Sequence, residues 1–164
     1  LRREQSGRSG FAANDPQSTL MIWRKLRDEG ALLGTRIVLL NTRQDRLDRA
    51  KQLAEMVGKE IHDEADVLLL IGQSTDVVES MSTSYGFEKN RIINIGWTEA
   101  SDVFENILSQ TSKVSTVVAI GNIGGMGNKV VEYFSFQHMS KETGPSYCCR
   151  FTYLFSSFFT NCSY

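Results

Sequence analysis

The chain has almost no excess of charge of either sign. Its 164 residues carry 18 basic side chains against 19 acidic ones, for a formal net charge of −1 at pH 7. A protein that binds a polyanion through bulk electrostatics needs a basic excess. The composition therefore argues against nucleic acid as a partner.

Cysteine and histidine are scarce. All three cysteines (Cys148, Cys149 and Cys162) lie in the last 17 residues, and the only histidines are His62 and His138. This cysteine usage fits a reducing, cytosolic compartment. Because no histidine or second cysteine pair stands at ligand spacing, the sequence predicts no metal site, and neither histidine is placed for catalysis.

Long apolar runs are also missing. No run reaches the ~18 residues that a membrane-spanning helix needs. The first ten residues, LRREQSGRSG, contain neither an initiating methionine nor the apolar core of a signal peptide. We therefore expect a soluble, cytoplasmic piece of a longer protein. No Walker A sequence occurs, so if the protein uses ATP, another domain must hold the triphosphate.

Short apolar runs alternate with helical patterns through the middle of the chain. The runs cover residues 36–40, 65–72, 91–96 and 115–121. They are continuous rather than alternating in polarity, which is typical of parallel strands buried on both faces. Apolar residues recur at helical spacing around them: Leu20, Trp23 and Leu26; Leu47, Ala50, Leu53, Ala54 and Val57; Val77, Val78 and Met81; Val103, Phe104, Ile107 and Leu108; and Val130, Val131 and Phe134. The alternation predicts an α/β domain with a Rossmann-like, doubly wound and mainly parallel sheet.

In such a sheet, ligands bind outside the carboxyl ends of the strands. The loops at those ends read NTRQDR (41–46), GQSTD (72–76), GWTE (96–99) and GNIGGMG (121–127). We therefore look for ligand contacts in these four loops.

The first of these loops is rich in charge. Arg43, Asp45 and Arg46 follow a predicted buried strand, and Asp48 and Arg49 come directly after them. One interpretation is a solvated helix start with ion pairs. The other is a ligand site, since arginine binds phosphate or carboxylate through two parallel hydrogen bonds and an adjacent aspartate can hold its side chain in place.

The last loop, GNIGGMG, has four glycines in seven residues. The spacing differs from the dinucleotide fingerprint, and the loop follows the fourth predicted strand instead of the first, so we do not predict an NAD site. A tight turn explains the glycines. Exposed backbone amides at a ligand surface are the alternative.

The stretch SGFAANDPQST, residues 9–19, precedes the first helical pattern. Asp15 and Pro16 fit a helix N-cap followed by proline at the first helical position. The cap does not explain Asn14 or the small residues before it, which would let a ligand approach the positive end of a helix.

From residue 137 onward the composition changes: aromatic residues gather, and Arg150 is the only charge in the final 18 residues. This tail carries no clear period. An extra edge element, a hydrophobic interaction segment and sequence foreign to the domain all remain open. We therefore divide the chain into an unplaced segment 1–8, a domain 9–136 and an unplaced tail 137–164.

Four segments carry a resemblance. GFAANDPQSTLMIW, VLLNTRQDRLDRAKQLA, LLLIGQSTD and AIGNIGG, in this order, resemble the C-terminal domain of the ligase subunit of poly-γ-glutamate synthase (the PgsB/CapB type), in the Mur ligase superfamily. The resemblance runs from residue 9 to 136. The chain departs from the family's pattern at Ser9, where Asn is typical, and at Gly124, where relatives often carry His.

The resemblance implies an ATP-dependent amide ligase. A carboxylate of the growing poly-γ-glutamate chain is phosphorylated, and the amine of glutamate attacks the acyl phosphate. The domain would be a lid over ATP and Mg²⁺ that a central domain, absent from this chain, mainly holds, and closure would exclude water. By resemblance, the partners include membrane subunits of a synthase complex, which would place the enzyme at the inner face of the cell membrane.

The resemblance also assigns residues. Asn14, Asp45 and Arg46 would contact the nucleotide. Substrate would be bound by Arg43, Gly72, Thr75, Gly121 and Asn122. No catalytic residue falls in this part of the protein, so the chain alone should be inactive. Two other functions remain open: a folylpolyglutamate-type or other ligase of the superfamily, and a non-catalytic module that binds a nucleotide or an amino acid.

Overall fold

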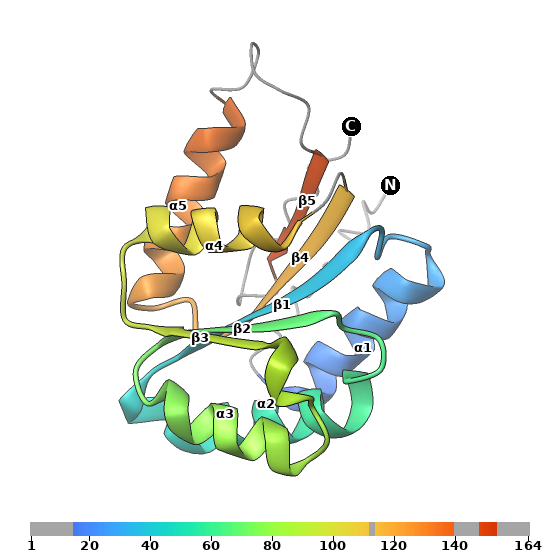
Figure 1. Ribbon diagram of the computed structural model, residues 1–164, viewed down its shortest axis with the longest axis vertical. Coiled ribbons are helices and arrows are strands. Elements are labelled where there is room, and N and C mark those ends of the chain that lie inside the picture. Colours follow the sequence, from blue (N-terminus) through green and yellow to red (C-terminus); the bar gives the residue numbers. More distant parts are fainter. Residues whose placement is uncertain (1–14, 112–113, 140–147, 154–164) are drawn as a thin grey trace, which may run out of the picture.

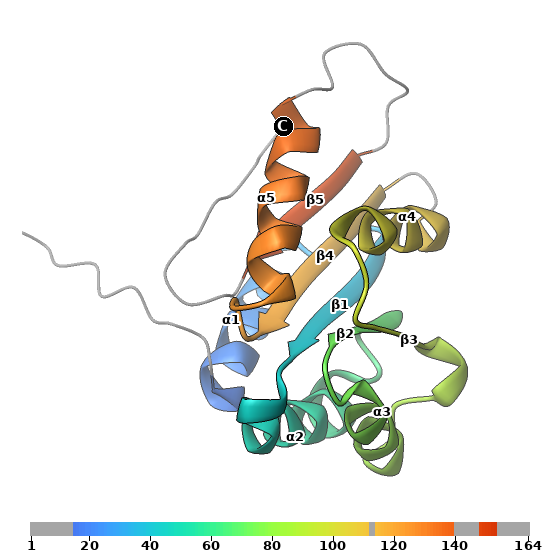
Figure 2. The ribbon, with the colours of Figure 1, turned by 90° about the vertical axis from the view of Figure 1, so that its left-hand side faces the viewer.

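The sheet is a single parallel layer of five strands. A computed structural model of the chain describes residues 15–111, 114–139 and 148–153. The strands are β1 (Thr35–Thr42), β2 (Val67–Gly72), β3 (Ile92–Gly96), β4 (Val114–Gly121) and β5 (Cys148–Tyr153). They lie in the order β3-β2-β1-β4-β5, and every neighbouring pair is parallel (Figure 2). The predicted doubly wound α/β fold is confirmed.

Helices cover both faces of this sheet (Figure 1). One face carries α1 (Pro16–Asp28), α2 (Leu47–Met56) and α3 (Thr75–Ser84), and the other carries α4 (Ala100–Gln110) and α5 (Met126–Met139). The short elements η1 (Gln44–Arg46), η2 (Val57–Ile61) and η3 (Lys89–Arg91) complete the connections. Because the chain changes face after β3, β4 lies beside β1, and the topological switch point falls between these two strands.

The core consists of two apolar layers, one on each side of the sheet. In β1, Val38 and Leu40 contribute to the layer under α1, α2 and α3, whereas Ile37 and Leu39 contribute to the layer under α4 and α5. All four side chains are fully buried. Successive side chains of a strand point to opposite faces, so a continuous apolar run fills both layers at once.

Two expectations about burial were wrong. Residues 92–96 of β3 are only half-buried, because β3 is an edge strand with β2 as its one neighbour in the described sheet. Val77 is 39% exposed, whereas its neighbour Val78 is fully buried. Two adjacent residues of a helix lie about 100° apart, so α3 turns only one of the two valines toward the sheet.

The tail contributes the fifth strand. Cys148–Tyr153 pairs with β4, in register from Val114↔Cys148 to Ala119↔Tyr153. Of the three alternatives for the tail, an extra edge element therefore describes these six residues. Helix α5 continues to Met139, beyond the boundary expected at residue 136. Residues 1–8 and 154–164 lie outside the described residues, and the division into domains stays a prediction.

The start of α1 is the capped helix that the sequence predicted. A side-chain oxygen of Asp15 accepts a hydrogen bond of 2.9 Å from the backbone N–H of Ser18, and Pro16 takes the first helical position. Farther along α1, Trp23 and Arg27 donate to the two carboxylate oxygens of Glu64 at 2.6 and 2.8 Å. These bonds fix α1 against the segment that leads into β2.

Candidate functional site

Three of the strands end at the same edge in a glycine with a positive φ. These are Gly72 (φ +99°), Gly96 (φ +71°) and Gly121 (φ +93°). A Cβ at Gly72 would lie 2.1 Å from the carbonyl oxygen of Thr42, and one at Gly121 would lie 2.5 Å from that of Asn41. Gly72 and Gly121, two predicted substrate contacts, therefore have a structural reason for being glycine. Their contact with a ligand stays a prediction.

Arg43 lies just beyond the end of β1. Its Nε and Nη2 atoms donate to the two carboxylate oxygens of Asp45, both at 2.9 Å. A guanidinium has five N–H groups, so this pairing leaves three. Two of them, one on each Nη atom, lie parallel at the far end of the planar group and are suited to another acceptor. Both side chains are partly exposed. Asp45 therefore fixes the direction in which Arg43 can receive a carboxylate or phosphate.

The loop between β4 and α5 lies against Arg43. A Cβ at Gly124 would come within 2.6 Å of the Arg43 Nη1 atom. In the same loop, Asn122 uses its side-chain oxygen to accept from the Gly124 backbone N–H at 2.9 Å. The structure thus brings together Arg43 and Asn122, two residues about 80 positions apart that the resemblance assigned to substrate.

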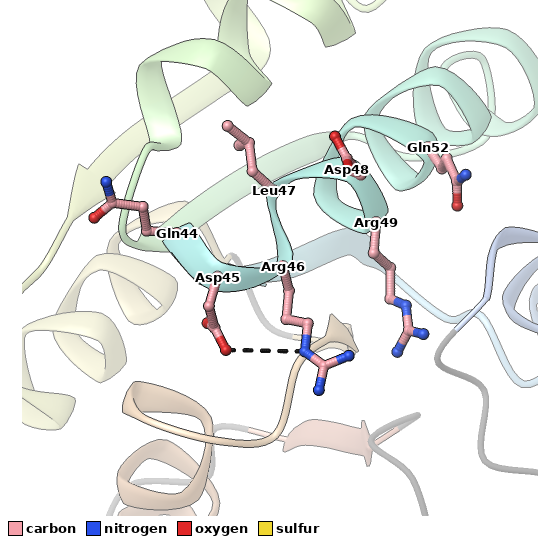
Figure 3. A pocket seen from close by; sticks show the side chains of 7 residues that line it. All are labelled: Gln44, Asp45, Arg46, Leu47, Asp48, Arg49 and Gln52. Carbon is pink, nitrogen blue, oxygen red and sulfur yellow. Dashed lines mark ion pairs between the residues drawn. The ribbon is translucent and has the colours of Figure 1, made fainter.

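A polar pocket of about 410 Å³ opens at the start of α2. Figure 3 shows Arg46 and Arg49 pointing to the same side of the helix, while Leu47 and Asp48 point to the other. The one ion pair of Arg46 with the described residues, to Asp45, is long at 3.9 Å. For Arg49 no hydrogen bond or ion pair to the described residues is found. The lining residues are Gln44, Asp45, Arg46, Leu47, Asp48, Arg49 and Gln52.

The lining of this pocket holds two arginines and two aspartates, and the arginines gather on one side of it. The 3₁₀ turn η1 runs directly into α2, and the helix dipole adds partial positive charge at this end. In the part of the chain that the structure describes, Arg46 has no side-chain partner at hydrogen-bonding distance, and Arg49 lies one turn farther along α2. Two guanidinium groups beside a helix N-terminus suit phosphate or carboxylate oxygens.

The loop after β2 is tied to the loop after β1. The hydroxyl of Thr42 donates to the carbonyl oxygen of Gln73, and the Gln73 side-chain oxygen accepts from the backbone N–H of Gln44 at 3.2 Å. Thr75, a predicted substrate contact, begins α3 and is only 6% exposed. A ligand can reach little of Thr75 in this conformation, and its assignment stays a prediction.

Two residues at this edge were assigned no ligand contact from the sequence. Arg49 was named only as part of the charged loop, and its spacing of three residues from Arg46 could have indicated a shared side of the helix. Trp97, in the loop after β3, is 59% exposed, and its ring lies 3.9 Å from where a Cβ of Gly125 would be. Nothing in its local pattern indicates this contact, which depends on the packing of two distant loops. Asn14, the remaining assigned residue, lies outside the described residues.

The described part of the chain offers neither a metal-ligand cluster nor a membrane-spanning helix. No group of three or more His, Cys, Asp or Glu side chains is gathered there in a way that could hold a metal ion. Among the same residues, no helix has both the length and the apolar character needed to cross a membrane.

Fold and site together define a Rossmann-like α/β domain that presents arginine side chains at the carboxyl edge of its sheet. Residues 3–137 match the family model of the poly-gamma-glutamate synthase CapB C-terminal domain. The chain belongs to this family.

Two curated proteins are similar to the chain. The PGA synthase CapB of Bacillus subtilis (strain 168) is 30% identical over 124 residues, which are 76% of this chain and 31% of that protein. The capsule biosynthesis protein CapB of Bacillus anthracis is 31% identical over 135 residues, which are 82% of this chain and 28% of that protein. The chain thus spans about a third of the length of these relatives. No solved structure matches it.

Proposed function

We propose that this chain is the C-terminal lid domain of an ATP-dependent amide ligase that adds glutamate to a growing poly-γ-glutamate chain. The observation that carries the proposal is the pair Arg46 and Arg49, which project from one side of the α2 N-terminus without close partners among the described residues, next to the oriented Arg43. Membership in the CapB family supports the substrate class.

The reaction joins a carboxylate to an amine with loss of phosphate. An oxygen of the acceptor carboxylate would bond to the terminal phosphorus of ATP, the bond from that phosphorus to ADP would break, and ADP would leave as the acyl phosphate forms. The amine of glutamate attacks the carbonyl carbon of this mixed anhydride, the C–O bond to phosphate breaks, and inorganic phosphate leaves with the bonding electrons. A proton from the ammonium group is released as the amide forms.

Residues of this chain would bind and orient the reactants. Arg46 and Arg49 would hold phosphate oxygens of the nucleotide at the start of α2, where the helix dipole favours negative charge. Arg43 would hold a carboxylate of the incoming glutamate or of the acceptor with the N–H groups that Asp45 leaves open. Folded over the nucleotide, the domain would exclude water, which would otherwise hydrolyse the acyl phosphate.

Most of the nucleotide and its Mg²⁺ would be held elsewhere. Among the described residues no group of three or more His, Cys, Asp or Glu side chains is gathered for a cation. We propose that a part of the protein outside this chain holds the Mg²⁺ and the triphosphate, and that membrane subunits of a synthase complex bring the enzyme to the inner face of the cell membrane. On its own, the chain would bind nucleotide weakly and would not hydrolyse it.

The test replaces Arg46 with alanine in the full-length protein that contains this chain. We expect kcat/KM for ATP-dependent incorporation of glutamate to fall at least about tenfold, while the melting temperature stays within a degree or two, because a partly exposed guanidinium contributes little to folding. The matched control is Arg24→Ala. Arg24 is an exposed arginine of α1 that pairs with Glu60 of η2. Unchanged turnover in Arg46→Ala, together with a lowered melting temperature, would reassign this loop to structure.

A further inference from the structure

The end of β1 and the loop before α5 are joined by a buried amide. Asn41 is only 2% exposed, and its Nδ2 atom donates to the carbonyl oxygens of Asn122 and Gly124. Its main-chain oxygen also accepts from the backbone N–H of Asn122 at 3.2 Å. Two carbonyl acceptors fix which atom of the amide is the nitrogen. The loop is therefore held to β1 by three hydrogen bonds from one residue.

Glycine at two positions makes room for this arrangement. A Cβ at Gly127 would lie 2.9 Å from the Asn41 Nδ2 atom, and one at Gly124 would lie 2.6 Å from the Arg43 Nη1 atom. Gly124, unlike Gly125, is not among the residues with positive φ. Its backbone therefore does not require glycine. A Cβ at this position would meet the end of the flexible Arg43 side chain and not a backbone atom, so a side chain at position 124 would move the guanidinium from its present place.

Asn41 and Arg43 reach the same loop because of their spacing. Arg43 has an extended backbone (φ −132°, ψ 143°) and follows Asn41 by two residues. Side chains two apart in an extended segment point to the same side. Within Asn41-Thr42-Arg43, the Asn41 amide therefore bonds to the backbone of the β4–α5 loop, and the Arg43 guanidinium lies against Gly124 of the same loop.

We propose that Asn41 and Gly124 are positioning residues for Arg43: the amide fixes the β4–α5 loop, and the gap at position 124 receives the guanidinium. Asp45 takes the edge formed by Nε and Nη2, and the loop lies beside Nη1. The second N–H of Nη2 and one N–H of Nη1 then lie parallel at the far end of the guanidinium, where they would receive a carboxylate ligand. The identity of this ligand rests on the proposed function, whereas the positioning itself does not.

The first measurement reports positioning without any ligand. The full-length protein is labelled with ¹⁵N at arginine, and the Arg43 Nε–Hε resonance is assigned by its loss in Arg43→Lys. In Gly124→Ala, and in Asn41→Ser, hydrogen exchange at Arg43 Nε should be at least about tenfold faster, because the pair with Asp45 is no longer supported by the loop. Gly124→Ala changes a half-buried loop position and keeps the test valid if Asn41→Ser fails to fold.

The matched control is Asn94→Ser. The Nδ2 atom of Asn94 also donates to two acceptors, Asp76 at 2.9 Å and Glu79 at 2.7 Å, but it lies on β3 and does not contact the β4–α5 loop through these bonds. This variant should leave the exchange rate at Arg43 Nε unchanged. Equal acceleration in the control, or no acceleration in Gly124→Ala, would overturn the proposal.

The second measurement separates this proposal from the proposed function. In Gly124→Ala we expect the KM for glutamate to rise about tenfold with a smaller change in kcat, and we expect no further rise when Gly124→Ala is added to Arg43→Ala. Faster exchange with an unchanged KM would uphold the positioning of Arg43 and remove glutamate as its ligand. An additive effect of the two substitutions would show that Gly124 acts independently of Arg43, against the proposal.

Discussion

Asp15 shows how a single side chain determines where α1 begins. Its carboxylate accepts from the Ser18 backbone N–H. Hydrogen bonding with Ser18, first through the serine side chain and then through its backbone N–H, lowers the pKa of Asp15 below its ordinary value. Its main-chain oxygen accepts from the N–H of Thr19, the first bond of the helix. The start of α1 is therefore fixed at Asp15, directly after Asn14, for which a nucleotide contact is predicted.

Replacing Asp15 by alanine should lower the free energy of unfolding by about 1 kcal/mol, because one of the free N–H groups of α1 loses its acceptor. Asp15→Asn retains an oxygen acceptor and should lower the free energy of unfolding by only about a few tenths of a kcal/mol. Urea unfolding of both variants measures the difference. Equal stability of the alanine and asparagine variants would contradict the capping role.

Asp66 makes stability depend on pH. Burial raises the pKa of its carboxyl, but the hydrogen bonds and the charge of Arg36 together lower it by more, so the pKa lies below its ordinary value. A carboxyl with a depressed pKa in the folded state stabilises the fold at pH above its unfolded pKa of about 4. This contribution is lost as the pH falls through the lower, folded pKa.

Urea unfolding between about pH 2 and pH 6 measures this effect, because the unfolded state binds the proton first. We expect the parent protein to lose stability steadily on acidification, and Asp66→Asn to be less stable near neutral pH but to lose less on acidification. Parallel curves for the two proteins would mean that the Arg36–Asp66 pair contributes nothing to the acid sensitivity.

At the scale of elements, the contact between α2 and α3 is set by a glycine. Helix α2 continues into the π-helical turn η2, and Gly58 in that turn is buried. A Cβ at Gly58 would lie 2.6 Å from the Tyr85 Cβ and 2.8 Å from the Ser82 carbonyl oxygen. The two segments can approach this closely only because position 58 has no side chain.

Gly58→Ala should therefore destabilise the protein by about 1–3 kcal/mol, since α3 must move away from η2 to accept a methyl group. The control is Gly30→Asn, at a position with φ +67° where a Cβ would meet no atom of the described residues within 4 Å, and where asparagine tolerates the left-handed backbone. Thermal unfolding of the two variants compares them. A Gly58→Ala protein as stable as the control would show that the helices can separate at no cost.

The elements that carry the proposed ligand contacts were largely predictable. Each predicted central strand lies within two residues of its observed bounds, because a continuous apolar run has few alternatives to a strand buried on both faces. Arg43, Asp45 and Arg46 were expected at the carboxyl edge for the same reason. The helical face of α3 was less well predicted, since two adjacent valines left open which one the sheet would cover.

At the scale of the whole molecule, β5 covers the outer edge of β4. Six consecutive residues of β5 pair with β4 in parallel. Without them, the backbone N–H and C=O groups along that edge of β4 would be unpaired, and an open edge next to a buried core favours association with another strand. The family match ends at residue 137, before this strand begins.

Removal of residues 140–164 should lower the free energy of unfolding by at least about 2 kcal/mol, since each ladder hydrogen bond contributes roughly 1 kcal/mol net. The shortened chain should also self-associate through β4. Urea unfolding and sedimentation velocity measure the two effects. A shortened protein that is monomeric and as stable as the parent would show that β5 does not belong to the sheet in solution.

The sequence by itself determined which segments become strands and helices, where α1 is capped, and which loops follow the strands. These are local properties of apolar spacing and capping chemistry. Only the tertiary structure decided that the chain changes face after β3, so that β4 lies beside β1 and the Gly124 loop meets Arg43. The order of strands depends on packing between segments about 80 residues apart, and no local pattern encodes the fit of a guanidinium into the space left by a distant glycine.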